Sequence, residues 1–168
     1  MFIVKKFRRM IAAAVTAGAL IFSPQVDSLN FMSVVRAESS QTNLAEQKFE
    51  EANKFYEQGK FAEAIELYTQ AIELNPSFAV VYYNLGNVYV ELGRIGSTLA
   101  DFNLLDAAYG KSSDNYKQAI ANYTKAIELN FEYAMIAYPN RGACYKKLGD
   151  SRKSKADFAK AKELGYED

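Results

Sequence analysis

The sequence predicts an all-α fold in which three helical hairpins stack against one another. The five residues Ala-Ile-Glu-Leu-Asn occur at 71–75 and again at 126–130, so these segments are copies of one structural unit. Gly59 and Gly93 are separated by 34 residues, a period typical of repeated helical hairpins. Within the first unit, apolar residues recur every three or four positions and charged residues take the opposite positions, as in amphipathic helices.

Residues 1–37 have the layout of a secretory signal peptide. Four basic residues precede an apolar run at residues 10–22, and a polar stretch follows that ends with a small residue at Ala37. The run has 13 residues, fewer than the roughly 20 that a membrane-spanning helix needs, which favours cleavage after Ala37 over permanent anchoring. The alternatives are an earlier cut near Ala17 or Ala19 and an uncleaved N-terminal membrane anchor.

A location and a domain plan follow from this layout. The mature protein is expected to be exported to the periplasm, the cell surface or the thylakoid lumen, or to stay membrane-anchored if the segment is not cleaved. A linker at residues 38–44 then leads to a repeat domain at 45–168. Its repeats are expected at residues 45–78, 79–131 and 135–168.

Three segments carry a common set of small and aromatic residues at matching positions. They are, in chain order, Ala52, Gly59, Ala64, Tyr68 and Pro76; Tyr82, Gly86, Tyr89, Gly93, Ala119 and Tyr123; and Gly142, Tyr145, Gly149 and Phe158. This set resembles the signature of the tetratricopeptide repeat (TPR) family, in particular small exported members of bacterial, cyanobacterial or plastid type. The resemblance covers nearly everything after residue 44. It implies a right-handed superhelical stack with a concave groove that binds protein partners.

Physical roles follow for the small residues of this set. Small side chains at positions such as Ala52 and Gly86 let paired helices approach closely, and neighbouring aromatic rings fill the space between hairpins. We expect Gly59, Gly93 and Gly149 to end the first helix of each hairpin in the left-handed conformation that glycine adopts readily.

The second repeat is interrupted by an insertion at residues 94–114. The next recognisable helix begins at Asn115, 21 residues later than the period requires. Inside the insertion Ser97 is a suitable helix cap. Apolar residues then recur at helical spacing, namely Leu99, Phe102, Leu105 and Tyr109. We therefore expect a short extra helix, which either packs on the outside of the stack or lies across the groove as a lid.

The third repeat begins irregularly. Phe131 stands where a terminating proline is expected, and Pro139 falls inside the first helix, where proline removes a backbone hydrogen bond. This helix is therefore expected either to start late, near Pro139, or to be kinked.

The resemblance places the first helix of each hairpin along the groove. By register, the groove residues are Phe49, Asn53, Tyr56, Tyr83, Asn84, Asn87, Ala143 and Lys146. Asparagine amides can pair with the N–H and C=O groups of a peptide while aromatic rings cover its apolar side chains. These residues are the predicted peptide-binding site.

Family members that hold the C-terminal carboxylate of chaperones use two asparagines and three basic residues. Asn53 and Asn84 match the amide positions in this sequence. The basic positions hold Phe49, Ile136 and Asn140 instead, so we do not expect an acidic chaperone tail as the ligand.

Charge is spread unevenly along the chain. Residues 38–168 carry 15 basic and 19 acidic groups, which argues against nucleic acid as a partner. Residues 45–76 hold seven acidic and three basic groups, whereas residues 135–168 hold five acidic and eight basic groups. The stack is therefore expected to be negative at its first end and positive at its last. This polarity could orient a partner, or promote a homodimer or head-to-tail self-association.

Nothing in the sequence indicates catalysis. The chain has no histidine, the commonest general base and a usual zinc ligand, and we expect neither a metal nor a cofactor. Cys144, the single cysteine, is expected to be a buried apolar residue. The predicted function is a non-catalytic protein-interaction module that binds a peptide in its groove. The alternative is a self-associating assembly factor for a membrane-bound complex, acting through the insertion or the convex face.

Overall fold

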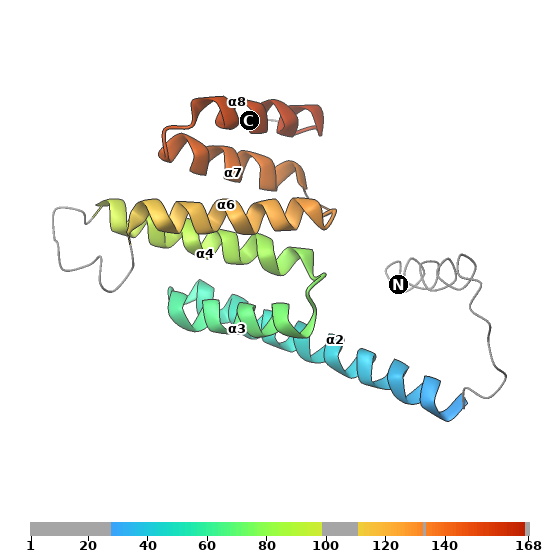
Figure 1. Cartoon of the computed structure of the whole chain (residues 1–168). Helices are drawn as coiled ribbons and strands as arrows, with labels where there is room; N and C mark the ends of the chain where they lie inside the picture. Colours follow the sequence, from blue (N-terminus) through green and yellow to red (C-terminus); the bar gives the residue numbers. More distant parts are fainter. Residues whose placement is uncertain (1–27, 99–110, 133, 167–168) are drawn as a thin grey trace. The chain divides into compact units, whose positions relative to one another are not determined.

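The computed structural model describes residues 28–98, 111–132 and 134–166. These residues form α-helices and no strand, which confirms the predicted all-α class. The helices are α2 (Ser28–Glu57), α3 (Phe61–Leu74), α4 (Ala79–Thr98), α6 (Ser112–Glu128), α7 (Ala134–Lys147) and α8 (Ser151–Glu163) (Figure 1).

The chain divides into two compact units after Glu38, and the helical hairpins belong to the second, residues 39–168. Residues 38–44, which the sequence suggests as a linker, are helical and belong to α2. The basic and apolar parts of the predicted signal peptide lie outside the described residues.

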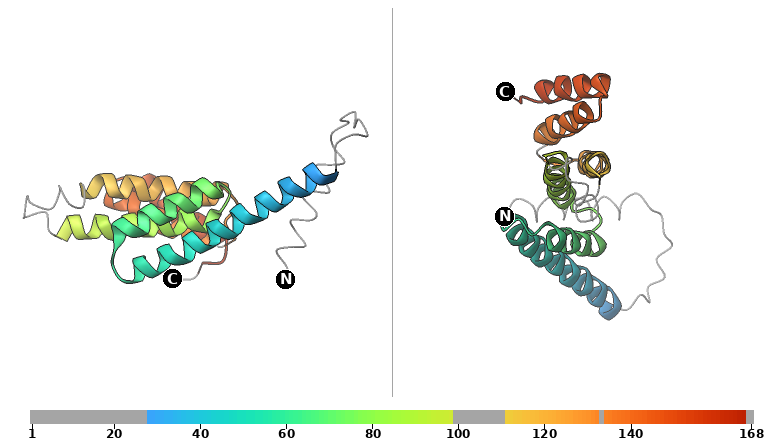
Figure 2. Two further views of the ribbon diagram at one scale, coloured as in Figure 1. Left: turned by 90° about the horizontal axis from the view of Figure 1, so that it is seen from below. Right: turned by 90° about the vertical axis from the view of Figure 1, so that its left-hand side faces the viewer.

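Three hairpins follow one another within the second unit. α2 pairs with α3, α4 with α6 and α7 with α8, while α3 contacts α4 and α6 contacts α7 between neighbouring hairpins (Figure 1 and Figure 2). The predicted stack of three helical hairpins is therefore confirmed.

Small residues let the two helices of a hairpin pack closely. In the first hairpin Ala52 on α2 and Ala64 on α3 are fully buried, and the ring of Tyr68 lies fully buried in the same core. In the second hairpin an ideal Cβ at Gly86 would lie 2.7 Å from Cε1 of Tyr123, so the ring occupies the space that a larger residue would need. Each of the first two hairpins thus pairs a small residue on its first helix with an aromatic ring on its second.

Two of the three glycines predicted to end helices do so. Gly59 and Gly149 follow α2 and α7 with φ angles of 72° and 82°, in the left-handed region. The prediction for Gly93 is wrong, because this residue lies buried inside α4. A Cβ at Gly93 would lie 2.9 Å from Cε1 of Tyr116, so the glycine allows α6 to pack on α4 and makes no turn.

The predicted insertion is partly regular helix. α4 continues to Thr98, so the first residues of the insertion extend this helix. Ser97 is not the expected cap, since it lies inside α4 and its Oγ donates to a backbone oxygen of the same helix at 2.8 Å. α6 begins at Ser112, three residues before the expected start at Asn115. The residues of the expected extra helix, Leu99, Phe102, Leu105 and Tyr109, lie outside the described residues.

The first helix of the third hairpin begins before Pro139, against one of the two expectations for this helix. α7 starts at Ala134, so a late start near Pro139 is wrong; Pro139 lies inside the helix and is buried. The chain reaches α7 through Asn130, whose φ of 55° is left-handed, and Phe131, which is buried. This turn therefore uses an asparagine and a buried ring where the first repeat has Pro76.

Gly86→Ala should lower the free energy of unfolding by about 1 to 3 kcal/mol, because the new methyl group meets the ring of Tyr123 in a packed core. Urea denaturation measures the change. In a Tyr123→Leu background the cost should shrink, since the ring is gone. Gly59→Ala is the matched control: among the described residues no atom lies within 4 Å of its Cβ, so its cost comes from the backbone alone. Equal costs of Gly86→Ala in both backgrounds would contradict the packing argument.

Candidate functional site

Four helices of the hairpin stack surround a pocket of about 320 Å³. Its lining residues come from α2, α4, α6 and α7 and are Tyr56, Asn87, Val90, Glu91, Arg94, Tyr116, Tyr123, Asn140, Ala143, Cys144 and Lys147. We call this pocket, together with the hydrogen-bonded neighbours Asn53, Tyr83 and Asn84, the groove.

Asn53 on α2 links the first hairpin to the second. Its Oδ1 accepts a hydrogen bond from Oη of Tyr68 at 2.6 Å and another from Nδ2 of Asn84 at 2.9 Å. Burial raises the pKa of Tyr68 to about 12, against the opposing effect of a hydrogen bond from Asn84, so the hydroxyl stays protonated and can donate. The oxygen of Asn53 is thus used inside the protein.

The same arrangement recurs in the second hairpin. Oη of Tyr123 donates to Oδ1 of Asn87 at 2.6 Å, and burial raises the pKa of Tyr123 above its usual value. Asn87 lies 34 residues after Asn53, so the two pairs are repeat-equivalent. In each hairpin the tyrosine fixes the orientation of the amide. The Nδ2 atoms of Asn53 and Asn87 make no hydrogen bond to other described residues.

Asn140 on α7 completes the row of amides. Its Nδ2 donates to Oη of Tyr83 at 3.1 Å, which leaves its Oδ1 as an acceptor. The ring of Tyr83 stacks on Phe131 with centroids 5.0 Å apart and lies 5.7 Å from the ring of Tyr123. The groove therefore combines amide groups of fixed orientation with an aromatic wall.

The structure brings some predicted groove residues together and leaves others outside. Tyr56, Asn87 and Ala143 line the pocket, whereas Lys146 is exposed and does not. The ring of Phe49 packs against the core of the first hairpin, 6.1 Å from Tyr68 and 5.3 Å from Phe78.

Several pocket residues are absent from the sequence prediction. The charged or apolar ones among them are Val90, Glu91, Arg94 and Lys147. Those on α4 follow Asn87 by three, four and seven positions, the spacing of one helix face. The signal was present in the sequence, but the predicted helix ended at Gly93, before Arg94.

The pocket carries a small excess of positive charge. Arg94 and Glu91 form an ion pair at 3.1 Å, whereas Lys147 makes no ion pair with another described residue.

Burial raises the pKa of Cys144 to about 12, so its thiol stays protonated at neutral pH. This agrees with the buried apolar role predicted for the cysteine. Oη of Tyr116 is buried and has no hydrogen-bond partner among the described residues.

Arg141, the arginine nearest to the positions of a carboxylate grip, is already bound inside the protein. Its Nε and Nη2 donate to the two carboxylate oxygens of Asp157 at 2.8 and 2.7 Å, and its Nη1 donates to Thr124 at 2.9 Å. The two charged side chains are 14% and 8% exposed. Hydrogen bonding to Asp157 raises the pKa of Arg141 further. This guanidinium therefore serves the packing of α6, α7 and α8.

The described residues offer neither a membrane-spanning helix nor a metal site. No helix there combines the length and apolar character needed to cross a membrane. No group of acidic and cysteine side chains in that part of the chain is arranged to hold a metal ion. The groove offers directional hydrogen bonds, aromatic surface and a cation without an acidic partner.

Stacked helical hairpins with a polar groove define a helical-repeat protein. A family model described as "TPR repeat" matches residues 52–93, and one described as "Tetratricopeptide repeat" matches residues 107–133 and 137–164, together more than half of the chain. The chain belongs to the tetratricopeptide repeat family.

Curated relatives match the chain over a small part of their own length. RNA polymerase II-associated protein 3 of Xenopus tropicalis is 30% identical over 115 residues, which cover 68% of this chain and 14% of the relative. Small glutamine-rich tetratricopeptide repeat-containing protein 2 of Mycosarcoma maydis is 29% identical over 130 residues, covering 70% and 37%. Human serine/threonine-protein phosphatase 5 is 30% identical over 114 residues, covering 68% and 18%.

Solved structures share the fold. The first TPR domain of Spaghetti, bound to the HSP90 peptide SRMEEVD, superposes with a TM-score of 0.58 at 26% identity, covering 74% of this chain and 81% of that one. The TPR domain of Arabidopsis OM64 gives a TM-score of 0.58 at 25% identity, with coverage of 74% and 85%.

Tyr123→Phe should lower the free energy of unfolding by about 1 to 2 kcal/mol, because it leaves Oδ1 of Asn87 without its donor. Asn87→Ala should cost a similar amount by leaving the buried hydroxyl without its acceptor. The double variant should cost less than the sum, since no polar group is then left unpaired. Urea denaturation measures all three. Tyr89→Phe, which removes a hydroxyl without a hydrogen bond to another described residue, is the control and should change little. Strict additivity would rule out the pair.

Proposed function

We propose that this protein is a non-catalytic interaction module that binds an extended peptide segment of a protein partner in the groove. One observation carries the proposal: buried tyrosines hold Asn53 and Asn87 so that both present an unused Nδ2 donor. Asn140, held by Tyr83, presents an acceptor instead. A peptide main chain supplies both kinds of group, so amides that donate and accept at fixed places suit it.

Fixed orientation favours binding for an energetic reason. A free asparagine loses rotational freedom when a ligand orders it, at a cost of about 0.5 to 1.5 kcal/mol for each side chain immobilised. Hydrogen bonds at 2.6 Å from Tyr68 and Tyr123 already impose that order in the unbound protein. The groove therefore loses little entropy when it binds.

The Spaghetti domain supports peptide binding by a fold of this kind, since it was solved bound to an HSP90 peptide. We do not propose the HSP90 peptide as the ligand of this chain. The positions that would grip a terminal carboxylate hold Phe49, Ile136 and Asn140 here, and Arg141 is bound to Asp157. We propose that the occupant is recognised through its main chain and apolar side chains, without dependence on a free C-terminus.

The test removes the donors and retains the fold. Asn53→Asp together with Asn87→Asp keeps an oxygen for Tyr68 and Tyr123 but deletes both Nδ2 donors. A peptide selected from a displayed random library on the unaltered chain should bind this variant at least about fivefold more weakly, since two hydrogen bonds of ~0.5 to 1.5 kcal/mol each are lost. Fluorescence anisotropy with the labelled peptide measures the affinity.

Asn122→Asp is the matched control for the added charge. Asn122 lies on α6 outside the pocket, and its Nδ2 donates to a backbone oxygen of its own helix. Its substitution should leave the affinity unchanged. Full affinity in the Asn53→Asp, Asn87→Asp variant would move the binding site away from the groove.

We also propose that the protein is exported, as small bacterial, cyanobacterial or plastid members of the family would be. The support is the sequence of residues 1–37, with basic residues, a short apolar run and a small residue at Ala37. An uncleaved segment would instead attach the chain to a membrane. The curated relatives named above align with only part of this chain and carry no argument on this point.

Cell fractionation with intact-mass measurement tests export. Cleavage should yield a soluble exported species that begins at Glu38, whereas an uncleaved anchor should yield the full mass in the membrane fraction. Replacing the basic residues before the apolar run with glutamate should block export in either case. Full-length protein that stays in the cytosolic fraction without that change would overturn the proposal.

A further inference from the structure

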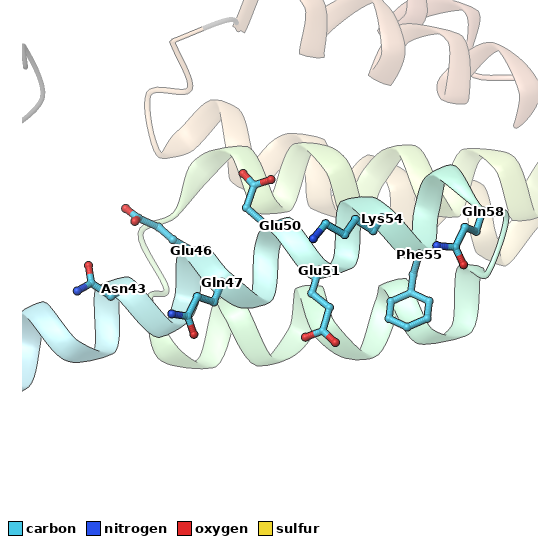
Figure 3. Close-up of a pocket in the computed structure, with 8 residues that line it drawn as sticks. All are labelled: Asn43, Glu46, Gln47, Glu50, Glu51, Lys54, Phe55 and Gln58. Atoms are coloured by element: carbon cyan, nitrogen blue, oxygen red, sulfur yellow. The ribbon is translucent and has the colours of Figure 1, made fainter.

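A second hollow, of about 810 Å³, runs along the outer side of α2 (Figure 3). Its described lining residues belong to this helix, apart from Gln58 in the turn that follows: Asn43, Glu46, Gln47, Glu50, Glu51, Lys54, Phe55 and Gln58. Most of them are exposed, and Phe55 is the aromatic member of the set. In Figure 3 the side chains of Gln47, Glu51 and Phe55 point to the same side of the helix.

The repeat register explains what this surface is. α4 packs on the first hairpin through buried apolar residues, which are Val81, Leu85, Val88 and Leu92, with Tyr89 partly buried beside them. The positions 34 residues earlier all line the hollow; they are Gln47, Glu51, Lys54 and Phe55 on α2 and Gln58 directly after it. The hollow on α2 is thus the equivalent of the surface on which α4 receives a preceding hairpin.

The outer face of α8 is the matching surface at the other end of the stack. In α3, Ile65 and Ile72 flank Tyr68 and pack against the core that includes α4. The equivalent positions on α8, counted from Ala64 and Ser154, are Lys155, Phe158 and Lys162. The ring of Phe158 is 39% exposed, and both lysines are exposed.

Charges on the two faces are opposite in sign. The α2 hollow carries three glutamates and one lysine. On α8, Lys155 and Lys162 make no ion pair with other described residues, so their charges are available to a partner. Each face also has one aromatic ring, Phe55 on α2 and Phe158 on α8.

We propose that the α2 hollow receives α8 of a second copy of this chain, in the way that α4 receives α3 inside one chain. Phe158 of the arriving copy would then lie against Phe55. Because Ile65 of α3 lies beside Leu92 of α4, Lys155 would lie beside Gln58 and Lys162 beside Glu51, so both lysines lie over a hollow of net negative charge. The two surfaces differ, so the contact is head-to-tail and can add further copies in a row. The partner of this surface is therefore the protein itself, independent of any peptide in the groove.

The balance of forces predicts a weak and salt-sensitive contact. Inside the stack the equivalent positions hold apolar residues, but on these two faces most of them hold charged or amide residues. Association therefore buries little apolar surface apart from the two rings. Exposed charge pairs add modestly and are screened as ionic strength rises. Association should therefore appear at low salt and high protein concentration, and should reverse on adding salt.

Sedimentation velocity of the purified full chain tests this. At low ionic strength the mean mass should rise continuously with concentration, as open chains require, and should return to the monomer value at high ionic strength. A constant monomer mass at all concentrations would overturn the proposal, and so would a dimer that salt does not dissociate.

Charge reversal identifies the surfaces. Variant one carries Glu50→Lys and Glu51→Lys, variant two carries Lys155→Glu and Lys162→Glu, and each alone should associate at least about tenfold more weakly than the unaltered chain. Mixed together they should associate again, because each α8 face then meets an α2 face of opposite charge. Association in either variant alone, or its absence in the mixture, contradicts the head-to-tail contact.

Matched controls place the same charge changes elsewhere. Glu63→Lys with Glu73→Lys changes two exposed residues of α3, and Lys117→Glu with Lys125→Glu changes two of α6. Both control variants should associate as the unaltered chain does. Thermal unfolding checks that all variants keep the fold, since these side chains are exposed and their replacement should shift stability little.

Discussion

A tyrosine hydroxyl buried between two helices is the constraint on which the first two hairpins depend. Tyr68 and Tyr123 fill the space left by Ala52 and Gly86, and their size brings a polar atom into the core. That atom needs an acceptor, which Asn53 and Asn87 supply from the first helix of each hairpin. One requirement of core packing therefore fixes the direction of the amides in the groove, so stability and the proposed recognition of a peptide rest on the same contact.

The third hairpin meets the packing requirement without that hydroxyl. Phe158 replaces the tyrosine, and Ala143 stands at the position of the asparagine, so donor and acceptor are lost together. The polar contact there is the buried pair of Arg141 and Asp157. If one member left the pair to bind a ligand, the other would remain as an uncompensated buried charge. The pair therefore has a structural role and does not bind a ligand. The tyrosine-held amides with unused donors therefore belong to the first two hairpins, and the third contributes through Asn140.

The fold was predictable because a similar pattern of small and aromatic packing residues occurs three times in the sequence. Gly59 and Gly149 were assigned correctly as helix ends, since a left-handed turn selects glycine. Gly93 shows the limit of that inference: glycine is also selected where a ring approaches, and only the position of Tyr116 tells the two apart. Because Gly93 was expected to end the helix, the predicted helix stopped before Arg94, which was therefore not expected to line the groove.

Groove chemistry was less predictable than the fold for a related reason. Register alone places Asn53, Asn84 and Asn87 on the inner face. It does not tell whether the oxygen or the nitrogen of each amide makes a hydrogen bond inside the protein. That depends on tyrosines 15 and 36 residues away in sequence. Register also gives no sign that the ring of Phe49 packs on Phe78, with centroids 5.3 Å apart.

The ends of the stack obey a different rule from its middle. Inside, Leu85 and Ile65 belong to one shared apolar core across two hairpins. At the ends, the equivalent positions hold Glu51 and Lys155. Charged ends keep a repeat array soluble, but solubility alone would be served by charges of one sign at both ends. Opposite signs reduce repulsion between the two unlike surfaces, so the substitutions that make each end polar also make the ends complementary.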